Sequence, residues 1–305
     1  MPDRAVTTAD LHVHTTVTDG RLKPSEVVDL AAGSGLEYLV FTDHSAVTFE
    51  SVLDYAAARG VRLPFPGTEV STFIGHRKHH VLVYGYGLLK ADVQHKLRFP
   101  VDGKLRDAQR ALDALAQRGL LLPSLADITA SGTAPGRPTP EKLFPSRTAI
   151  AWQLAQASGL SPAEARRHVE SAFHDAARED QTGPPRLERR YLPALEVIGM
   201  AAARGLTTSL AHPLWECATI REIAEVCDAI RLMADAGLAG IESRSYHHRE
   251  LDDHPMLLRT RADLGLIPTG GSDFHANGKT ELGSCGLAAD EFAAFWEVVA
   301  NADHA

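Results

Sequence analysis

The feature that most constrains the fold is an alternation of short apolar runs with stretches of helical pattern. The run at residues 38–42 is almost continuously apolar, as expected of a strand buried on both faces of a parallel sheet. A helical pattern follows the first predicted strand, residues 9–15, and has Pro24 near its first turn. This alternation indicates an α/β fold built on a parallel sheet or barrel.

The alternation stops once, in the middle of the chain. Strand signals fade from residue 88 to 190, whereas residues 105–121 and 147–157 look helical. We therefore predict a helical insertion at 88–190 that interrupts a barrel made of residues 1–87 and 191–305. The strands we predict for this barrel cover residues 9–15, 38–42, 63–71, 80–86, 206–212, 240–243 and 266–273.

Composition limits the classes of partner. Apolar residues make up 44% of the 305 residues, so a sizeable core can be buried. The formal net charge of -8 argues against a stable complex with nucleic acid or with an anionic membrane. An anionic small substrate remains compatible, because a local metal cluster can outweigh the global charge.

Cysteine usage and hydropathy bear on the compartment. The cysteines are Cys217, Cys227 and Cys285, a sparse and odd set that indicates reduced thiols instead of a disulfide framework. We see no charged-then-apolar leader and no apolar run that approaches membrane-spanning length. We expect a soluble, cytoplasmic protein without a membrane partner, and nothing in the sequence indicates an oligomeric state.

Histidines and carboxylates recur where the predicted strands end. His12 and His14 are two apart on the first strand, so their imidazoles share one face. The pair Asp43-His44 directly follows the apolar run at 38–42, at the position where a barrel places its site. Taken singly, each motif has an ordinary explanation; Asp43, for example, would suit a helix N-cap.

The conjunction is the stronger signal. Random placement would not put such residues at nearly every strand end. A set this large exceeds the needs of one tetrahedral ion and suffices for two or three. The nine candidate ligands are His12, His14, Asp19, His44, Glu69, His80, His212, Asp273 and His275.

These motifs resemble the PHP (polymerase and histidinol phosphatase) family. The strings DLHVHT, TDG, FTDHS, PGTEVS, HVLVYG, LAHP and GGSDFH occur in that family's order, between about residues 9 and 277. The resemblance implies a distorted seven-stranded (β/α)7 TIM-like barrel with a trinuclear metal site. It also implies divalent manganese, iron or zinc as the ions.

The resemblance implies a role for each ligand. One ion would be held by His12, His14, Glu69 and Asp273. A second would be held by Glu69, His80 and His212, so that Glu69 bridges. The third would be held by Asp19, His44 and His275. Among these residues, we expect His44, Asp19, His212 and His275 to act most directly in catalysis.

The implied reaction is hydrolysis of a phosphate ester by a hydroxide held between the ions. The helical insertion and the phrase GIESRSYHH resemble bacterial members that release the 3'-phosphate of a nucleoside 3',5'-bisphosphate. In SRTAIAWQL, Arg147 would contact a substrate phosphate, although Ala149 stands where the family motif commonly has histidine. Arg244 and His247 could also line the mouth, or could belong to a solvated loop.

Other functions remain open on the residues alone. The substrate could be histidinol phosphate, another phosphorylated biosynthetic intermediate, or a short oligonucleotide cut by a phosphodiesterase or exonuclease activity. An amidohydrolase is a further alternative, because its first barrel strand also carries an H-x-H motif. That interpretation gives no role to Asp19, His44 or the GSDFH motif. A non-catalytic metal-binding module is the remaining alternative.

Overall fold

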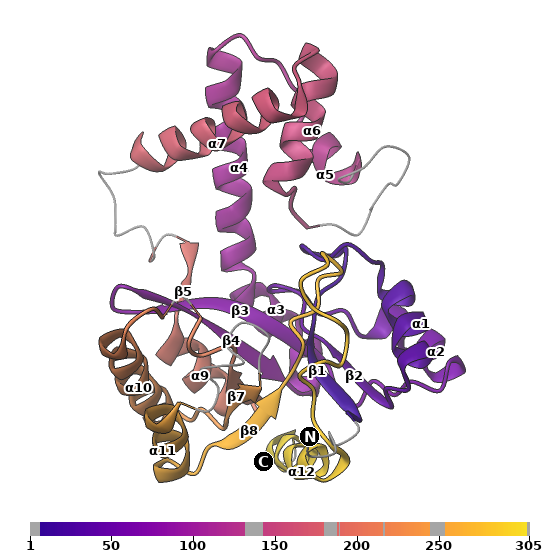
Figure 1. The fold of residues 1–305 in the computed structure, drawn as a ribbon, viewed down its shortest axis with the longest axis vertical. Coiled ribbons are helices and arrows are strands. Elements are labelled where there is room, and N and C mark those ends of the chain that lie inside the picture. Colours follow the sequence, from indigo (N-terminus) through magenta and orange to yellow (C-terminus); the bar gives the residue numbers. More distant parts are fainter. Residues whose placement is uncertain are drawn as a thin grey trace.

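The computed structural model describes residues 7–131, 143–179, 188, 190–215, 217–244 and 254–303. It has two lobes, which Figure 1 shows one above the other. The larger lobe contains the strands and is flanked by helices. The smaller lobe is helical and stands on the long helix α4 (Phe99–Gln117).

The strands form two open sheets. In the first, β1 (Ala9–Val13) pairs in parallel with β2 (Tyr38–Phe41). The second is a six-stranded sheet in the order β5-β3-β4-β6-β7-β8. Its strands are β3 (Gly67–Ile74), β4 (Arg77–Tyr84), β5 (Leu192–Pro193), β6 (Thr207–Leu210), β7 (Gly240–Arg244) and β8 (Ile267–Gly270).

The mixed α/β fold is confirmed, but the described strands do not close into the seven-stranded barrel that we expected. Isolated bridges lie at both edges of the first sheet. His44, which follows β2, pairs with Glu69 of β3, and Val13 of β1 pairs with Phe274, which follows β8. These bridges bring the ends of β1 and β2 beside their neighbours in the larger sheet without a continuous ladder.

The expectation of a parallel sheet was wrong at β4, which pairs antiparallel with both of its neighbours, β3 and β6. Strands β3 and β4 form an antiparallel hairpin whose turn contains Gly75 at φ 56°. A turn this short leaves no room for a crossover helix, so the second strand runs back along the first. In consequence Glu69 lies near the start of β3 and His80 lies inside β4, and neither is at a carboxyl end.

Helices cover the sheets on the sides away from the helical lobe. In Figure 1, α10 and α11 flank one end, α1 and α2 flank the other, and α12 lies underneath near both termini. Buried apolar side chains of α9 and α10, such as Ile198 and Ile230, pack on the large sheet. The helices are α1 (Pro24–Ser34), α2 (Leu53–Ala58), α9 (Ala194–Ala202), α10 (Ile220–Asp235), α11 (Pro255–Asp263) and α12 (Ala289–Asp303).

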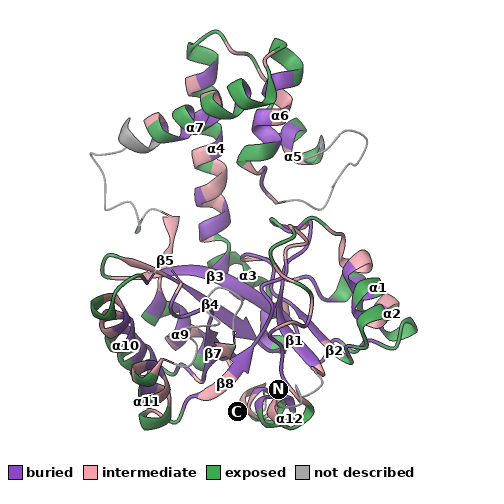
Figure 2. Ribbon diagram, viewed as in Figure 1, coloured by how far each residue is buried: buried purple, intermediate pink, exposed green. Residues whose placement is uncertain are grey.

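The helical lobe has a core of its own. It is built from α4, α5 (Leu125–Ser131), α6 (Arg147–Ser158) and α7 (Pro162–Glu179). By contrast, α3 (Ala91–Leu97) packs Val93 and Leu97 into the core of the large sheet. The foot of α4 is buried as well (Figure 2), so this helix joins the two lobes rigidly. No helix in the described ranges is long and apolar enough to cross a bilayer.

Gly271 is a position where the fold admits no side chain. A Cβ atom there would lie 2.3 Å from Cβ of His12 and 2.6 Å from its backbone nitrogen. We predict that Gly271→Ala lowers the free energy of unfolding by about 1–3 kcal/mol, since this close packing must open. Urea denaturation checks this.

Gly33→Ala is the matched control, because Gly33 lies in α1 with nothing within 4 Å of the added Cβ. Alanine favours a helix over glycine by about 0.5–1 kcal/mol, so this variant should be as stable as the wild type or slightly more stable. Equal stability of the two variants would contradict the prediction.

Candidate metal centre

The nine predicted ligands converge at one cavity. It opens between the strand lobe and the foot of α4 and has a volume of about 420 Å³. Asp19, Glu69 and Asp273 line it with four of the histidines, whereas His12 and His14 lie fully buried behind them. Segments from β1, β2, the hairpin, β6 and β8 therefore each deliver at least one potential ligand.

Glu69 lies at the centre of this arrangement and is 1% exposed. Its Oε1 lies 2.6 Å from Nδ1 of His80 and 3.1 Å from Nε2 of His212. Its Oε2 lies 3.1 Å from Nδ1 of His44 and 3.2 Å from Nε2 of His14. Each oxygen thus faces its own pair of imidazoles, as a carboxylate that bridges two ions would.

The pair His12 and His14, at the end of β1, faces Asp273. Nε2 of His12 and Nε2 of His14 are 3.0 Å apart, and each lies 3.2–3.3 Å from Oδ1 of Asp273. Donors bound tetrahedrally to one ion at 2.0–2.1 Å are separated by about 3.3 Å. The three atoms therefore have the spacing of ligands to a single cation.

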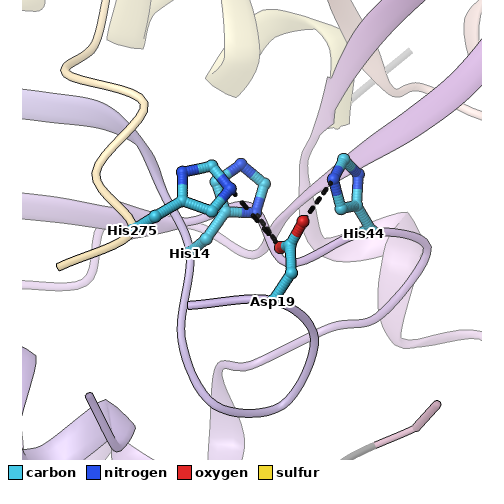
Figure 3. Close-up of side chains that lie close together, drawn as sticks. All are labelled: His14, Asp19, His44 and His275. Carbon is cyan, nitrogen blue, oxygen red and sulfur yellow. Dashed lines mark ion pairs between the residues drawn. The ribbon is translucent and has the colours of Figure 1, made fainter. Parts of the chain in front are cut away.

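A third group surrounds Asp19. Figure 3 shows its carboxylate between His44 on one side and His14 and His275 on the other. The carboxylate oxygens lie 3.3 Å from Nε2 of His44, 3.4 Å from Nε2 of His275 and 3.7 Å from Nδ1 of His14. One potential donor atom from each of the four residues lies within 4.8 Å of the others.

Two buried imidazole atoms indicate what the centre would hold. Nδ1 of His14 and Nδ1 of His44 are buried and make no hydrogen bond among the described residues, although each faces a carboxylate oxygen, that of Asp19 at 3.7 Å and that of Glu69 at 3.1 Å. A buried polar nitrogen without a partner is costly and uncommon in a folded protein. A divalent cation would satisfy both atoms, and a mixed imidazole and carboxylate donor set suits manganese, iron or zinc.

The carboxylates are held in the charged form that a metal requires. Burial by itself would raise the pKa of Glu69, but the charges of His80, His44 and His12 outweigh it and hold the pKa well below its usual range. Desolvation likewise opposes the charged form of Asp19, yet His44 and His275 keep the pKa of that carboxyl well below its usual value. Both groups are therefore ready anionic ligands at neutral pH.

Comparison with known proteins points to one class. The chain is 27% identical over 280 residues to the 3',5'-nucleoside bisphosphate phosphatase of Chromobacterium violaceum, covering 88% of each protein. It is 26% identical over 275 residues to a phosphoribosyl 1,2-cyclic phosphate 1,2-diphosphodiesterase of Eggerthella lenta, covering 87% of this chain and 93% of that protein. No established family profile matches the chain.

Solved structures share the fold over nearly the whole chain. A proposed metal-dependent phosphoesterase of Bifidobacterium adolescentis aligns with a TM-score of 0.68 at 24% identity, covering 95% of this chain and 96% of the other. A Chromobacterium violaceum protein described as an amidohydrolase, solved with bound sulfate and no metal, aligns with a TM-score of 0.66 at 25% identity, covering 96% of each.

The chain is thus similar to metal-dependent phosphoesterases, in line with the resemblance of its motifs to the PHP family. All four names are those of hydrolases, and this chain is a hydrolase as well.

The predicted substrate-binding residues are less well grouped than the predicted metal ligands. Arg147 does not line the metal cavity; it lies in a groove between α6 and α7, paired with Glu170 at 2.9 Å and stacked over Phe173. His247 and the side chain of Arg244 lie outside the described residues. Our sequence reasoning missed the cations that do line the cavity, which include Lys78, Lys104 and Lys279.

Our sequence reasoning also missed the acids that contact the predicted ligands or the loops that carry them. Asp43 caps no helix; it accepts hydrogen bonds from the hydroxyls of Thr15, Thr18 and Thr48 at 2.6–2.7 Å and so holds the loop before Asp19. Asp10 accepts from Ser272 in the same way, and Glu242 contacts His12. The signal in the sequence for Asp10 and Glu242 was a carboxylate inside a strand, whereas Asp43 follows an apolar run.

Backbone strain marks the same centre. His212 and Asp273 adopt positive φ values of 27° and 49°, and so do Ser45 and Ala276, which directly follow ligands, at 51° and 52°. Such conformations are costly for residues other than glycine and persist where the surroundings enforce them. The strained residues are thus predicted ligands or directly follow one.

Metal binding should release a proton from His14. Burial alone would lower the pKa of His14, but hydrogen bonds to Asp273 and Glu69 outweigh it and raise the pKa to about 10. Below that pH the metal-free imidazole carries a proton that an ion must displace, so Mn²⁺ affinity should rise with pH. We predict release of about one proton from this site at pH 7.

Calorimetric titration of Mn²⁺ in two buffers of different protonation enthalpy measures this release. His14→Gln should reduce the number of protons released. His76→Gln should leave it unchanged, because His76 is exposed and does not line the cavity. A wild-type protein that binds Mn²⁺ without releasing protons would refute the prediction.

Proposed function

We propose that this chain is a phosphatase that removes the 3'-phosphate of a nucleoside 3',5'-bisphosphate, using two or three divalent ions. The observation that carries the proposal is the cavity itself, which seven of the nine predicted ligands line together with several lysines. The Chromobacterium violaceum relative, named for this substrate, supports the choice over most of the chain length.

The charge distribution of the cavity favours a substrate with more than one phosphate. The protein as a whole has a formal net charge of -8, yet Lys78, Lys104 and Lys279 line this cavity. Bound ions would engage the phosphate that reacts. The lysines would then remain for a second phosphate, which a simple monoester such as AMP lacks.

Lys104 is the best placed of these cations. It comes from the buried foot of α4, with its Nζ 4.3 Å from the ring centroid of Phe144. Burial lowers the pKa of Lys104, and the negative charges of Asp19 and Glu69 counteract that effect. Arg147 could take the same role only after leaving Glu170.

The division of labour in the mechanism follows from these positions. Bound ions would activate water and neutralise charge on the phosphate. Glu69, with His80 and His212 against one oxygen and His44 and His14 against the other, fixes the spacing of the donor atoms. Lys104 orients the phosphate from the opposite wall, and the foot of α4 shields the cavity from bulk water.

A second candidate is hydrolysis of a cyclic phosphodiester. It is favoured by the relative from Eggerthella lenta, which is named for a phosphoribosyl 1,2-cyclic phosphate and matches this chain nearly as well. Both reactions would use the same ions and differ in whether the phosphorus carries one ester bond or two.

Analysis of the products tests the two candidates together: phosphate release for the monoesters, and ring opening or chain cleavage for the diesters. Protein purified with Mn²⁺ is assayed on adenosine 3',5'-bisphosphate, phosphoribosyl 1,2-cyclic phosphate, histidinol phosphate, AMP and short oligonucleotides. We expect the highest kcat/KM on the bisphosphate and loss of that activity in His44→Ala. Preference for the cyclic ester would replace our substrate. Inactivity on every ester despite bound metal would refute the enzymatic proposal.

Lys104 provides a test of substrate selection. We predict that Lys104→Ala lowers kcat/KM for the bisphosphate about 10–100-fold, the effect of losing a charged hydrogen bond of about 1.5–3 kcal/mol. The loss should be smaller for AMP. Lys96→Ala is the control, because Lys96 is exposed on α3 and does not line the cavity. Equal losses for both variants or both substrates would contradict this role.

A further inference from the structure

Glu242 is a buried acid that lies beside the metal centre without belonging to its predicted ligands. It is 0% exposed and does not line the cavity. Both of its carboxylate oxygens are used, and each contacts a different predicted ligand. A fully buried carboxylate is costly unless its partners satisfy it, so its place in the middle of β7 calls for a reason.

The first contact fixes the tautomer of His12. Oε1 of Glu242 lies 2.9 Å from Nδ1 of His12. An ionised carboxylate only accepts hydrogen bonds, so Nδ1 must carry the proton. The lone pair of the neutral ring is then on Nε2, the atom that faces His14 and Asp273.

The second contact holds a strained backbone. Oε2 of Glu242 accepts a hydrogen bond of 2.6 Å from the N–H of His212. His212 has φ 27°, a value that residues other than glycine rarely adopt. This bond stabilises the conformation from which the imidazole of His212 reaches Oε1 of Glu69 at 3.1 Å.

The carboxylate is anchored by the sheet around it. Strand β7 lies between β6 and β8, with Leu210 opposite Ile241 on one side and Thr269 opposite Glu242 on the other. A residue on a central strand has little freedom to shift. Its two oxygens therefore impose a fixed separation on the groups that they bind.

We propose that Glu242 is a positioning residue that ties His12 to His212 and thereby sets the relative placement of two ion sites. His12 belongs to a group with His14 and Asp273, and it also belongs to the group of Glu69 and His212. The two rings lie almost parallel, with an interplanar angle of 24° and centroids 5.7 Å apart. This inference rests on the proposed metal centre but not on the identity of the substrate.

The contacts of Glu242 differ from those of the other supporting acids. Asp10 and Asp43 accept hydrogen bonds from backbone N–H groups and hydroxyls, and so hold loops. Among the hydrogen bonds of these three acids that the structure describes, a bond to an imidazole ring is found only at Glu242.

Glu242→Gln is the sharpest test, because an amide cannot replace the carboxylate in either orientation. If its oxygen faces the N–H of His212, its NH2 donates to Nδ1 of His12 and shifts the ring proton to Nε2, the ligand atom. If it is reversed, NH2 and the backbone N–H of His212 meet as two donors. Glu242→Asp keeps the charge, but its shorter side chain cannot span both partners.

The measurement is metal affinity, obtained by competition of Mn²⁺ and Zn²⁺ with a chromophoric chelator and by metal analysis after dialysis. We expect the affinity of at least one ion to fall about 10–100-fold in Glu242→Gln, as is usual when the partner of a ligating histidine is lost. The ion held by Asp19, His44 and His275 should be retained.

Thr269→Val is the matched control. Thr269 is buried opposite Glu242 on β8 and bonds the hydroxyl of Ser209 at 2.6 Å without touching a predicted ligand. It should lower the melting temperature and leave metal affinity unchanged. If Glu242→Gln does not fold, Glu242→Asp is judged by the same affinity measurement.

Unchanged affinity in the folded Glu242 variant, or an equal loss in Thr269→Val, would overturn the inference. A wild-type protein that binds no ion would overturn this inference together with the proposed metal centre. Normal metal binding with no activity on any phosphate ester would refute only the proposed function, because the affinity comparison uses no substrate.

Discussion

A buried carboxylate must be neutralised, and the requirement is most acute at Glu69. This residue is 1% exposed and lies within 3.2 Å of four imidazoles that come from four different segments of the chain. Burial opposes its charge, whereas the surrounding histidines hold its pKa well below the usual range. Because those histidines are far apart in sequence, the strands that deliver them must meet at this one point.

The strands that meet there are held by buried acids outside the predicted set of metal ligands. Asp10, Asp43 and Glu242 are fully buried, and each binds groups in a different part of the centre. They also explain how strained residues such as His212 can persist, since hydrogen bonds compensate an unfavourable φ. These acids thus help to hold the potential donor atoms of the centre in place.

The helical segment contributes to both lobes. Leu97 belongs to the core of the large sheet, whereas Leu115 belongs to the core of the helical lobe. Helix α4 joins the two, and from its foot Lys104 lines the cavity. The segment that we predicted as an insertion therefore supplies one wall of the site, where differences between relatives would alter the substrate without altering the metal ligands.

Periodicity and strand-end histidines predicted the α/β class and a ligand set that the structure brings together, because both depend on patterns within one segment. Tertiary structure alone decided the rest. A short turn with Gly75, not a helix, joins β3 to β4, so these two strands pair antiparallel. The described strands form two open sheets where we expected a closed barrel. Arg147, expected at the phosphate, pairs with Glu170, and Lys104 lies at the cavity instead. Such pairings join distant residues, and no local pattern encodes them.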